Sequence, residues 1–80
     1  MEQRPLVLIT SRHCHLCEHG RGVLAALGLE AREIDAETEE AKQLADNGVP
    51  LAFLPVLWDG ERMLGYGRLS ERRLRRELAE

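Results

Sequence analysis

The chain has 80 residues and a net charge of −3, and its composition is 44% hydrophobic and 31% charged. A chain of this length forms one domain at the small end of what folds alone, and its aliphatic content is too high for a disordered protein. We therefore expect a single domain over residues 1–80. With one Phe, one Trp and one Tyr, stacking on single-stranded nucleic acid is poorly supported, and no apolar run is long enough for a membrane helix.

The first predicted element is a strand over residues 5–10, where a continuous aliphatic run is typical of a strand buried on both faces of a sheet. Apolar and small positions then recur at helical spacing from about Leu16 to Leu27. Gly28 is placed to end that helix as its C-terminal cap. The sequence thus begins with a central strand followed by a helix.

A short and more polar second strand is predicted over residues 31–35, and its polarity favours a place at the edge of the sheet. These first three elements form a βαβ unit. Thr38 is a suitable N-cap for a second helix that ends near Gly48. This part of the chain is strongly acidic, whereas the carboxyl-terminal part is rich in arginine, and a basic helix face is more often solvated than a nucleic-acid site.

The carboxyl-terminal half predicts a β-hairpin and a third helix. An apolar run over residues 51–58, the turn pair Asp59-Gly60 and a short strand near residues 62–64 form the hairpin. Because proline cannot donate to a sheet ladder, Pro55 should open the first strand of that hairpin or mark a special backbone geometry. Ser70 then caps an arginine-rich helix at the end of the chain.

The only two cysteines lie two residues apart, directly after the first predicted strand. A helix that opens at Cys14 directs unpaired N–H groups and the positive end of its dipole at that sulfur, which stabilises a thiolate. Cys14 is then the nucleophile, and Cys17, one turn inside the helix, is the resolving thiol. The helix end and Arg12 should lower the pKa of the Cys14 thiol from about 8.5 into the range of roughly 3.5–7.5. The protonated side chain of His13 or His15 acts in the same direction.

Metal binding is an alternative reading of this segment, because His13, His15 and His19 surround the cysteine pair. No other Cys or His occurs in the chain, so a closed four-ligand zinc site would need several ligands from a single helical turn. A metal or iron–sulfur cluster that bridges two chains is a second alternative. A third is that the cysteines are simply small buried neighbours. We expect His19, a further turn along the helix, to be solvated and no resident metal to be bound.

The sequence also bears on the compartment. The amino-terminal residues lack the basic-then-apolar pattern of a secretory signal, so we expect a cytoplasmic protein. Cysteines in that reducing compartment seldom form a permanent structural disulfide, so their pairing should be transient. We further expect a monomer with no bound cofactor and with no membrane or nucleic-acid partner.

The order βαβαββα, with a dithiol at the first strand-to-helix junction, resembles the glutaredoxin-like branch of the thioredoxin fold. The residues that carry the resemblance are Cys14-His15-Leu16-Cys17, Phe53-Leu54-Pro55-Val56-Leu57, Asp59-Gly60 and Gly65-Tyr66-Gly67. The resemblance implies an α/β fold whose four-stranded mixed sheet has the order 2-1-3-4 and is flanked by three helices. It also implies a cis peptide bond before Pro55, beside the dithiol, and glycines after the last strand that let substrate approach.

The activity implied by the resemblance is that of a thiol–disulfide oxidoreductase, which reduces protein or peptide disulfides through Cys14 and Cys17. We expect eight further residues to contact substrate: Arg12, His13, His15, Leu54, Pro55, Gly65, Tyr66 and Gly67. The electron source is glutathione or a flavin-dependent reductase of the thioredoxin reductase type, and the strand start Leu54-Pro55-Val56 is similar to that of family members reduced by thioredoxin reductase. The alternative is a non-enzymatic module on the same fold that binds metal or an iron–sulfur cluster or docks partners through its basic third helix.

Overall fold

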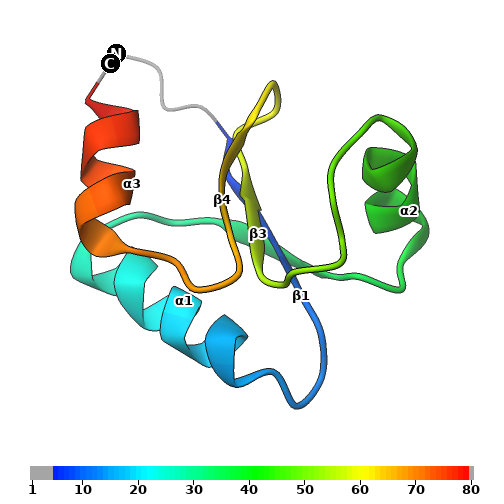
Figure 1. Cartoon of the computed structure of the whole chain (residues 1–80), viewed down its shortest axis with the longest axis horizontal. Helices are drawn as coiled ribbons and strands as arrows, with labels where there is room; N and C mark the ends of the chain where they lie inside the picture. Colours follow the sequence, from blue (N-terminus) through cyan, green and yellow to red (C-terminus); the bar gives the residue numbers. More distant parts are fainter. Residues whose placement is uncertain (1–4, 80) are drawn as a thin grey trace.

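The computed structural model describes residues 5–79, which form four strands and three helices (Figure 1). In chain order the elements are β1 (Val7–Thr10), α1 (His15–Ala26), β2 (Arg32–Asp35), α2 (Glu39–Asp46), β3 (Val56–Trp58), β4 (Met63–Tyr66) and α3 (Glu71–Leu78). The predicted order βαβαββα is therefore confirmed. Within the described residues, none of the helices is long and apolar enough to cross a membrane.

The four strands form one mixed sheet of order β2-β1-β3-β4. β1 is parallel to β2 and antiparallel to β3, and β3 is antiparallel to β4. The predicted sheet order is confirmed, and the polar strand β2 lies at an edge as expected. This order places β1 in the middle of the sheet, directly before the segment that carries the cysteines.

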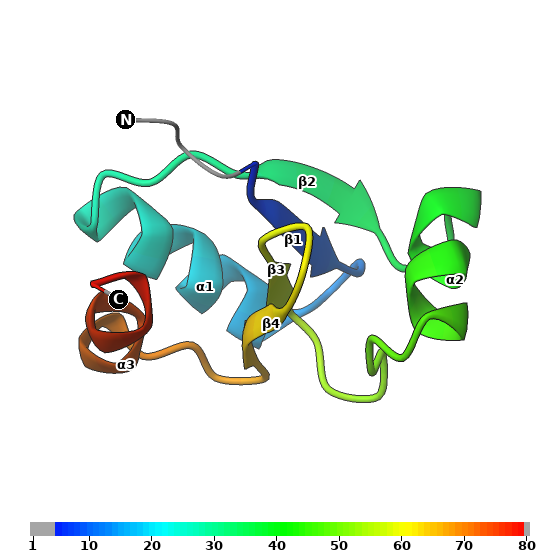
Figure 2. The same cartoon turned by 90° about the horizontal axis from the view of Figure 1, so that it is seen from above.

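The burial of β1 explains its continuous apolar sequence. Leu6 and Leu8 belong to the hydrophobic cluster that includes Leu24 of α1, whereas Val7 and Ile9 belong to the cluster that includes Ala41 of α2. Figures 1 and 2 show the same division, with α1 and α3 on one face of the sheet and α2 on the other. Because successive side chains of a strand point to opposite faces, both faces of β1 require apolar residues.

The predicted ends of the helices are confirmed by their hydrogen bonds and backbone angles. The hydroxyl oxygen of Thr38 accepts a hydrogen bond from the N–H of Ala41, and that of Ser70 accepts one from the N–H of Arg73, both at 3.2 Å. Such side-chain acceptors satisfy N–H groups that have no partner within the helix. Gly28 follows α1 with a φ of +69°, the left-handed conformation that glycine adopts most easily.

The hairpin is shorter at its start than the apolar run suggests. Only Val56–Trp58 form β3, so residues 51–55 lie outside the sheet and Pro55 directly precedes the strand, as predicted. The second strand reaches further than expected, because Val56 pairs with Tyr66. This pairing brings the end of β4 beside the start of β3.

Candidate redox site

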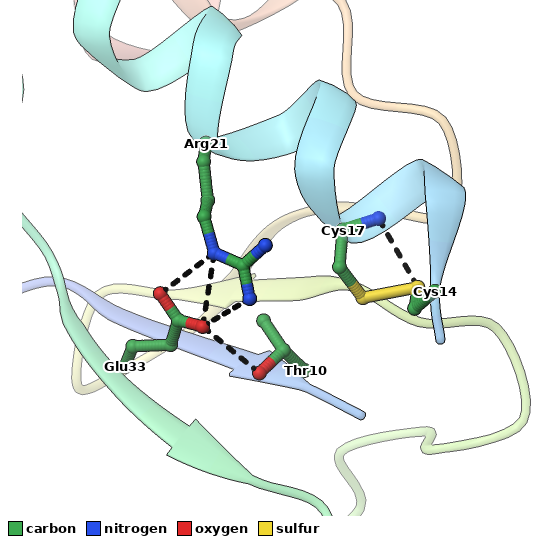
Figure 3. Close-up of polar contacts among 5 residues, drawn as sticks. All are labelled: Thr10, Cys14, Cys17, Arg21 and Glu33. Atoms are coloured by element: carbon green, nitrogen blue, oxygen red, sulfur yellow. Dashed lines mark hydrogen bonds and ion pairs between the residues drawn. A yellow bond between two sulfur atoms is a disulfide. The ribbon is translucent and has the colours of Figure 1, made fainter. Parts of the chain in front are cut away.

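Cys14 is the N-cap of α1 and follows the loop that leaves β1. Its Sγ accepts a hydrogen bond from the backbone N–H of Cys17 at 3.1 Å. The Cα atoms of the two cysteines are 5.2 Å apart and their sulfur atoms are at disulfide distance (Figure 3). The first turn of the helix therefore directs a backbone N–H at the sulfur of Cys14, as the sequence predicted.

The two cysteines differ in their access to solvent. The side chain of Cys17 is fully buried, at 0% exposure, whereas Cys14 is only half-buried. Cys17 lies on the inward face of α1 together with Gly20 and Val23. The expectation that the sulfur of Cys17 is shielded is confirmed, and Cys14 is the member of the pair that is partly exposed to solvent.

A polar pocket of about 650 Å³ lies on one side of Cys14. The loop after β1 and the start of α1 supply much of its wall through Ser11, Arg12, His13, Cys14 and His15. Arg12, His13 and His15 are all exposed, and His13 has a φ of +54°, a left-handed backbone that histidine tolerates better than most residues. The structure thus brings three of the predicted substrate-contacting residues together with Cys14.

The same pocket contains a polar network that the sequence analysis did not identify. Nε of Arg21 donates to both carboxylate oxygens of Glu33 at 3.0 Å, and the hydroxyl of Thr10 donates to Oε1 of Glu33 at 3.2 Å (Figure 3). The hydrogen bond from Arg21 is the main reason that the pKa of the Glu33 carboxyl lies below its ordinary value. This network joins α1, β2 and β1 beside the cysteine pair.

On the other side of the site, the peptide bond between Leu54 and Pro55 is cis, as the resemblance implied. Pro55 is buried and Leu54 is half-buried. A Cβ atom placed on Gly20 would come within 3.2 Å of Cγ of Pro55, so the proline ring lies against α1. Because Gly20 follows Cys17 by one helical turn, Pro55 packs on the same face of the helix that buries Cys17.

The predicted position of the Gly65-Tyr66-Gly67 segment is wrong in part. Gly65 and Tyr66 lie within β4, and only Gly67 follows the strand, because the pairing of β3 with β4 extends to Tyr66. A Cβ atom on Gly65 would come within 3.0 Å of the side chain of Leu69, so the space above this glycine is filled. The N–H of Gly67 donates to the carbonyl oxygens of Phe53 at 3.2 Å and Pro55 at 2.9 Å, which ties this turn to the proline loop.

His19 also differs from its expected place in solvent. It is half-buried, and its Nε2 atom is 3.0 Å from the carbonyl oxygen of Leu69, to which it donates. This contact joins α1 to the segment between β4 and α3, and no local sequence signal marks it. Among residues 5–79, no group of three or more His, Cys, Asp or Glu side chains is arranged to hold a metal ion.

Comparisons with known proteins agree with the observed fold. No family model and no curated protein matches the sequence. Among solved structures, the chain is similar to the solution structure of glutaredoxin from Brucella melitensis, with a TM-score of 0.64 and 22% sequence identity. The match covers 99% of this chain and 83% of that one. Together with the sheet order, it shows that the chain has a glutaredoxin-like thioredoxin fold.

Proposed function

We propose that the chain is a thiol–disulfide oxidoreductase that reduces disulfides of proteins or peptides through Cys14 and Cys17. The observation that supports this most directly is the hydrogen bond from the N–H of Cys17 to the sulfur of Cys14 at the mouth of α1. A backbone donor in this position stabilises a thiolate, and the thiolate is the form that attacks disulfides. The glutaredoxin-like fold gives the same proposal independent support.

The exchange proceeds in two displacements. The Cys14 thiolate attacks one sulfur of the substrate disulfide, which forms a mixed disulfide and releases the other substrate sulfur as a thiolate that takes up a proton. The Cys17 thiol then loses its proton and attacks Sγ of Cys14. This second step forms the Cys14–Cys17 disulfide and releases the remaining substrate thiol. The substrate gains two electrons and two protons, and the protein gains one disulfide.

The difference in burial supports separate roles for the two sulfurs. Cys14 is accessible and accepts the backbone hydrogen bond, so it suits the first attack. Cys17 is fully buried and lies within disulfide distance of Cys14, so it suits the second, intramolecular step. Holding the resolving thiol at this distance turns that step into a fast unimolecular reaction.

The residues around the cysteines have proposed roles in substrate binding. Arg12, His13 and His15 surround the exposed side of Cys14 and offer hydrogen-bond donors to the substrate backbone or to carboxylates. On the opposite side, Leu54, Tyr66 and Gly67 are accessible and offer a wall to the disulfide segment. Pro55 is buried and Leu69 fills the space above Gly65, so these two residues shape that wall from behind.

Cysteine variants test the proposed activity. We expect Cys14→Ser to abolish reduction of a small model disulfide, and Cys17→Ser to accumulate a mixed disulfide detectable by mass spectrometry. Full activity of Cys14→Ser combined with an inactive Cys17→Ser would reverse the two roles. Absorbance and metal content of anaerobically purified protein test the binding-module alternative, because a bound cluster or a stoichiometric metal would contradict the proposal.

The electron donor needs a separate comparison. After each turnover the Cys14–Cys17 disulfide has to be reduced again, either by two glutathione molecules or by the dithiol of a flavoprotein reductase. We expect one of two coupled assays to support turnover of the same substrate, one with glutathione and its reductase and the other with thioredoxin reductase. Failure of both assays, while a chemical dithiol still reduces the protein, would contradict both proposed donors.

A further inference from the structure

Exposed apolar side chains gather around the candidate redox site. Four large hydrophobic residues within the described residues are exposed: Leu16 at 37%, Phe53 at 63%, Tyr66 at 50% and Leu78 at 40%. Leu16 lies between the two cysteines, Phe53 lies two residues before Pro55, and Tyr66 ends β4. Only Leu78, at the end of α3, belongs to another part of the molecule. Exposed apolar groups concentrated in one place mark interaction sites more often than scattered ones do.

Phe53 and Tyr66 are in contact although they belong to different segments. Their ring centroids are 6.1 Å apart and the ring planes are inclined by 49°, a tilted arrangement that aromatic pairs favour. In both Figure 1 and Figure 2, the end of β4 and the start of β3 lie beside the start of α1. The aromatic pair therefore borders the end of the sheet at which Cys14 lies.

Backbone hydrogen bonds fix the pair relative to the proline loop. Gly67 directly follows Tyr66, and its N–H donates to the carbonyl oxygens of Phe53 and Pro55. Gly67 has a φ of +65°, which other residue types adopt only with strain. Since the ring of Pro55 in turn lies on α1 beside Gly20, the aromatic pair is held in place before any partner arrives. A pre-organised surface loses little entropy when it binds.

The geometry points to a subsite in which Phe53 and Tyr66 receive an apolar side chain of the substrate protein, next to the cysteine that Cys14 attacks. This inference rests on the proposed function, because exchange requires the substrate disulfide to reach Cys14. An extended substrate segment rises about 3.3 Å per residue, so side chains within roughly three residues of the attacked cysteine reach the surroundings of the site. The occupant is thus a peptide segment with Leu, Ile, Phe or a similar residue beside its cysteine.

The surface favours such a segment over a small charged thiol. Phe53 and Tyr66 present ring carbons and one phenolic hydroxyl, and neither carries a charge that pairs with a carboxylate or an ammonium group. Aromatic side chains supply large contact areas when they are covered, and they are enriched among residues that dominate binding energies. The aromatic pair therefore selects among protein disulfides by the residues that flank them.

A comparison of substrates tests the subsite. Two peptides with the same intramolecular disulfide carry either Leu or Asp beside one cysteine, and bis(2-hydroxyethyl) disulfide serves as a substrate without side chains. For the unaltered protein we expect kcat/KM to be higher for the Leu peptide than for the Asp peptide. We compare each variant by the ratio of kcat/KM for the Leu peptide to kcat/KM for the small disulfide. In Phe53→Ala and Tyr66→Ala this ratio should fall about tenfold, because truncation of a residue that dominates a binding contact weakens binding by about this factor.

Matched variants separate this effect from a general loss of structure. Leu78→Ala also removes an exposed apolar side chain, which lies beside Ala26 at the end of α1 opposite to Cys14, and should leave the ratio unchanged. Phe53→Tyr keeps the ring and should retain the preference for the Leu peptide. An unchanged ratio in both Phe53→Ala and Tyr66→Ala would overturn the subsite. It would also be overturned if the unaltered protein formed a concentration-dependent dimer that either variant dissociates, because the aromatic pair would then bind a second copy of the chain. Absence of turnover with every disulfide in the unaltered protein would instead overturn the proposed function on which the subsite rests.

Discussion

Gly20 and Pro55 are in close contact across the candidate site: a Cβ atom on Gly20 would come within 3.2 Å of Cγ of Pro55 and within 3.1 Å of the side chain of Leu69. Gly20 lies one turn after Cys17 on the buried face of α1. The absence of a side chain at this position thus allows the proline loop to approach the helix that carries both cysteines. Gly22, on the exposed face of the same helix, has no atom within 4 Å of such a Cβ and provides a matched comparison.

We predict different effects for alanine at these two glycines. Gly22→Ala should stabilise the protein by about 0.5–1 kcal/mol, because glycine is unfavourable inside a helix and nothing opposes the added methyl group. Gly20→Ala gains the same helical preference but has to displace Pro55 or Leu69. It should therefore be less stable than Gly22→Ala and reduce disulfide exchange roughly tenfold through displacement of the proline loop. Urea denaturation and turnover of a model disulfide measure both effects, and equal activity of the two variants would contradict the prediction.

We predict that the Cys14 thiol ionises at a lower pH than an ordinary cysteine. In Cys17→Ser, the rate of alkylation of Cys14 by iodoacetamide should rise with pH around a midpoint below about 8.5, because the N–H groups at the mouth of α1 favour the thiolate. The same variant unfolded in urea supplies the control, since the helix is then absent and the midpoint should return to about 8.5. Equal midpoints in the folded and unfolded protein would show that the helix end does not activate this sulfur.

We predict that Glu33 stabilises the fold in a pH-dependent way. The hydrogen bond from Arg21 holds the pKa of the Glu33 carboxyl below its ordinary value of 4.5, and the hydroxyl of Thr10 adds to this effect. A carboxyl with a lowered pKa contributes stability that is present above its ordinary pKa and is lost as the pH falls through the folded-state value. The stability advantage over Glu33→Gln should hence be present at neutral pH, decline as the pH falls below 4.5 and vanish once the pH is below the folded-state pKa.

The size of this difference should be modest, because the Glu33 side chain is 40% exposed and solvent screens the ion pair. Urea midpoints measured across the acid range compare the unaltered protein with Glu33→Gln. Glu37→Gln neutralises an exposed carboxyl nearby in the sequence and should follow the unaltered protein at every pH. A difference in urea midpoint between the unaltered protein and Glu33→Gln that stays constant at all pH values would contradict a stabilising role of the ionised Glu33 carboxylate.

We predict that Leu69 is a major stabilising residue. Its side chain is 3% exposed and fills the space beside both Gly20 and Gly65, so it joins α1 to β4. Leu69→Ala should cost about 2–5 kcal/mol, as is typical of a buried leucine that leaves a cavity. Leu78→Ala, which shortens a leucine that is 40% exposed, should change the free energy of unfolding by only about 0.5 kcal/mol. A similar loss in the free energy of unfolding for the two variants would contradict this prediction, because it would show that the structure closes the cavity left by Leu69 at no cost in stability.

Local sequence signals predicted the elements whose causes lie within a few residues. Thr38 and Ser70 were recognisable as N-caps because each precedes a helical pattern, and Gly28 because a left-handed residue ends many helices. The burial of β1 on both of its faces followed from its continuous apolar sequence. Cys14 and Cys17 were identifiable for the same reason, since their spacing and their position after a strand are both visible in the sequence.

Contacts between distant segments were not predictable in this way. The network of Arg21, Glu33 and Thr10 depends on the register of β1 with β2 and on the rotation of α1 above them, and each residue alone resembles an ordinary surface residue. The bond between His19 and Leu69 spans 50 positions of sequence and carries no local mark. The extension of β4 to Tyr66 likewise follows from pairing with β3, which the local composition of β4 does not specify.

The cap of α1 and the chemistry proposed for the site share a single atom. The N–H of Cys17 donates both to the sulfur of Cys14 at 3.1 Å and to the carbonyl oxygen of Cys14 at 3.2 Å. A charged acceptor forms a hydrogen bond roughly twice as strong as a neutral one, so the charge on the sulfur decides how firmly this N–H is held. A thiolate therefore anchors the start of α1 more firmly than a sulfur joined to a substrate does. Each catalytic cycle should loosen and retighten the first turn of the helix, and amide hydrogen exchange at Cys17 would report the redox state of the protein.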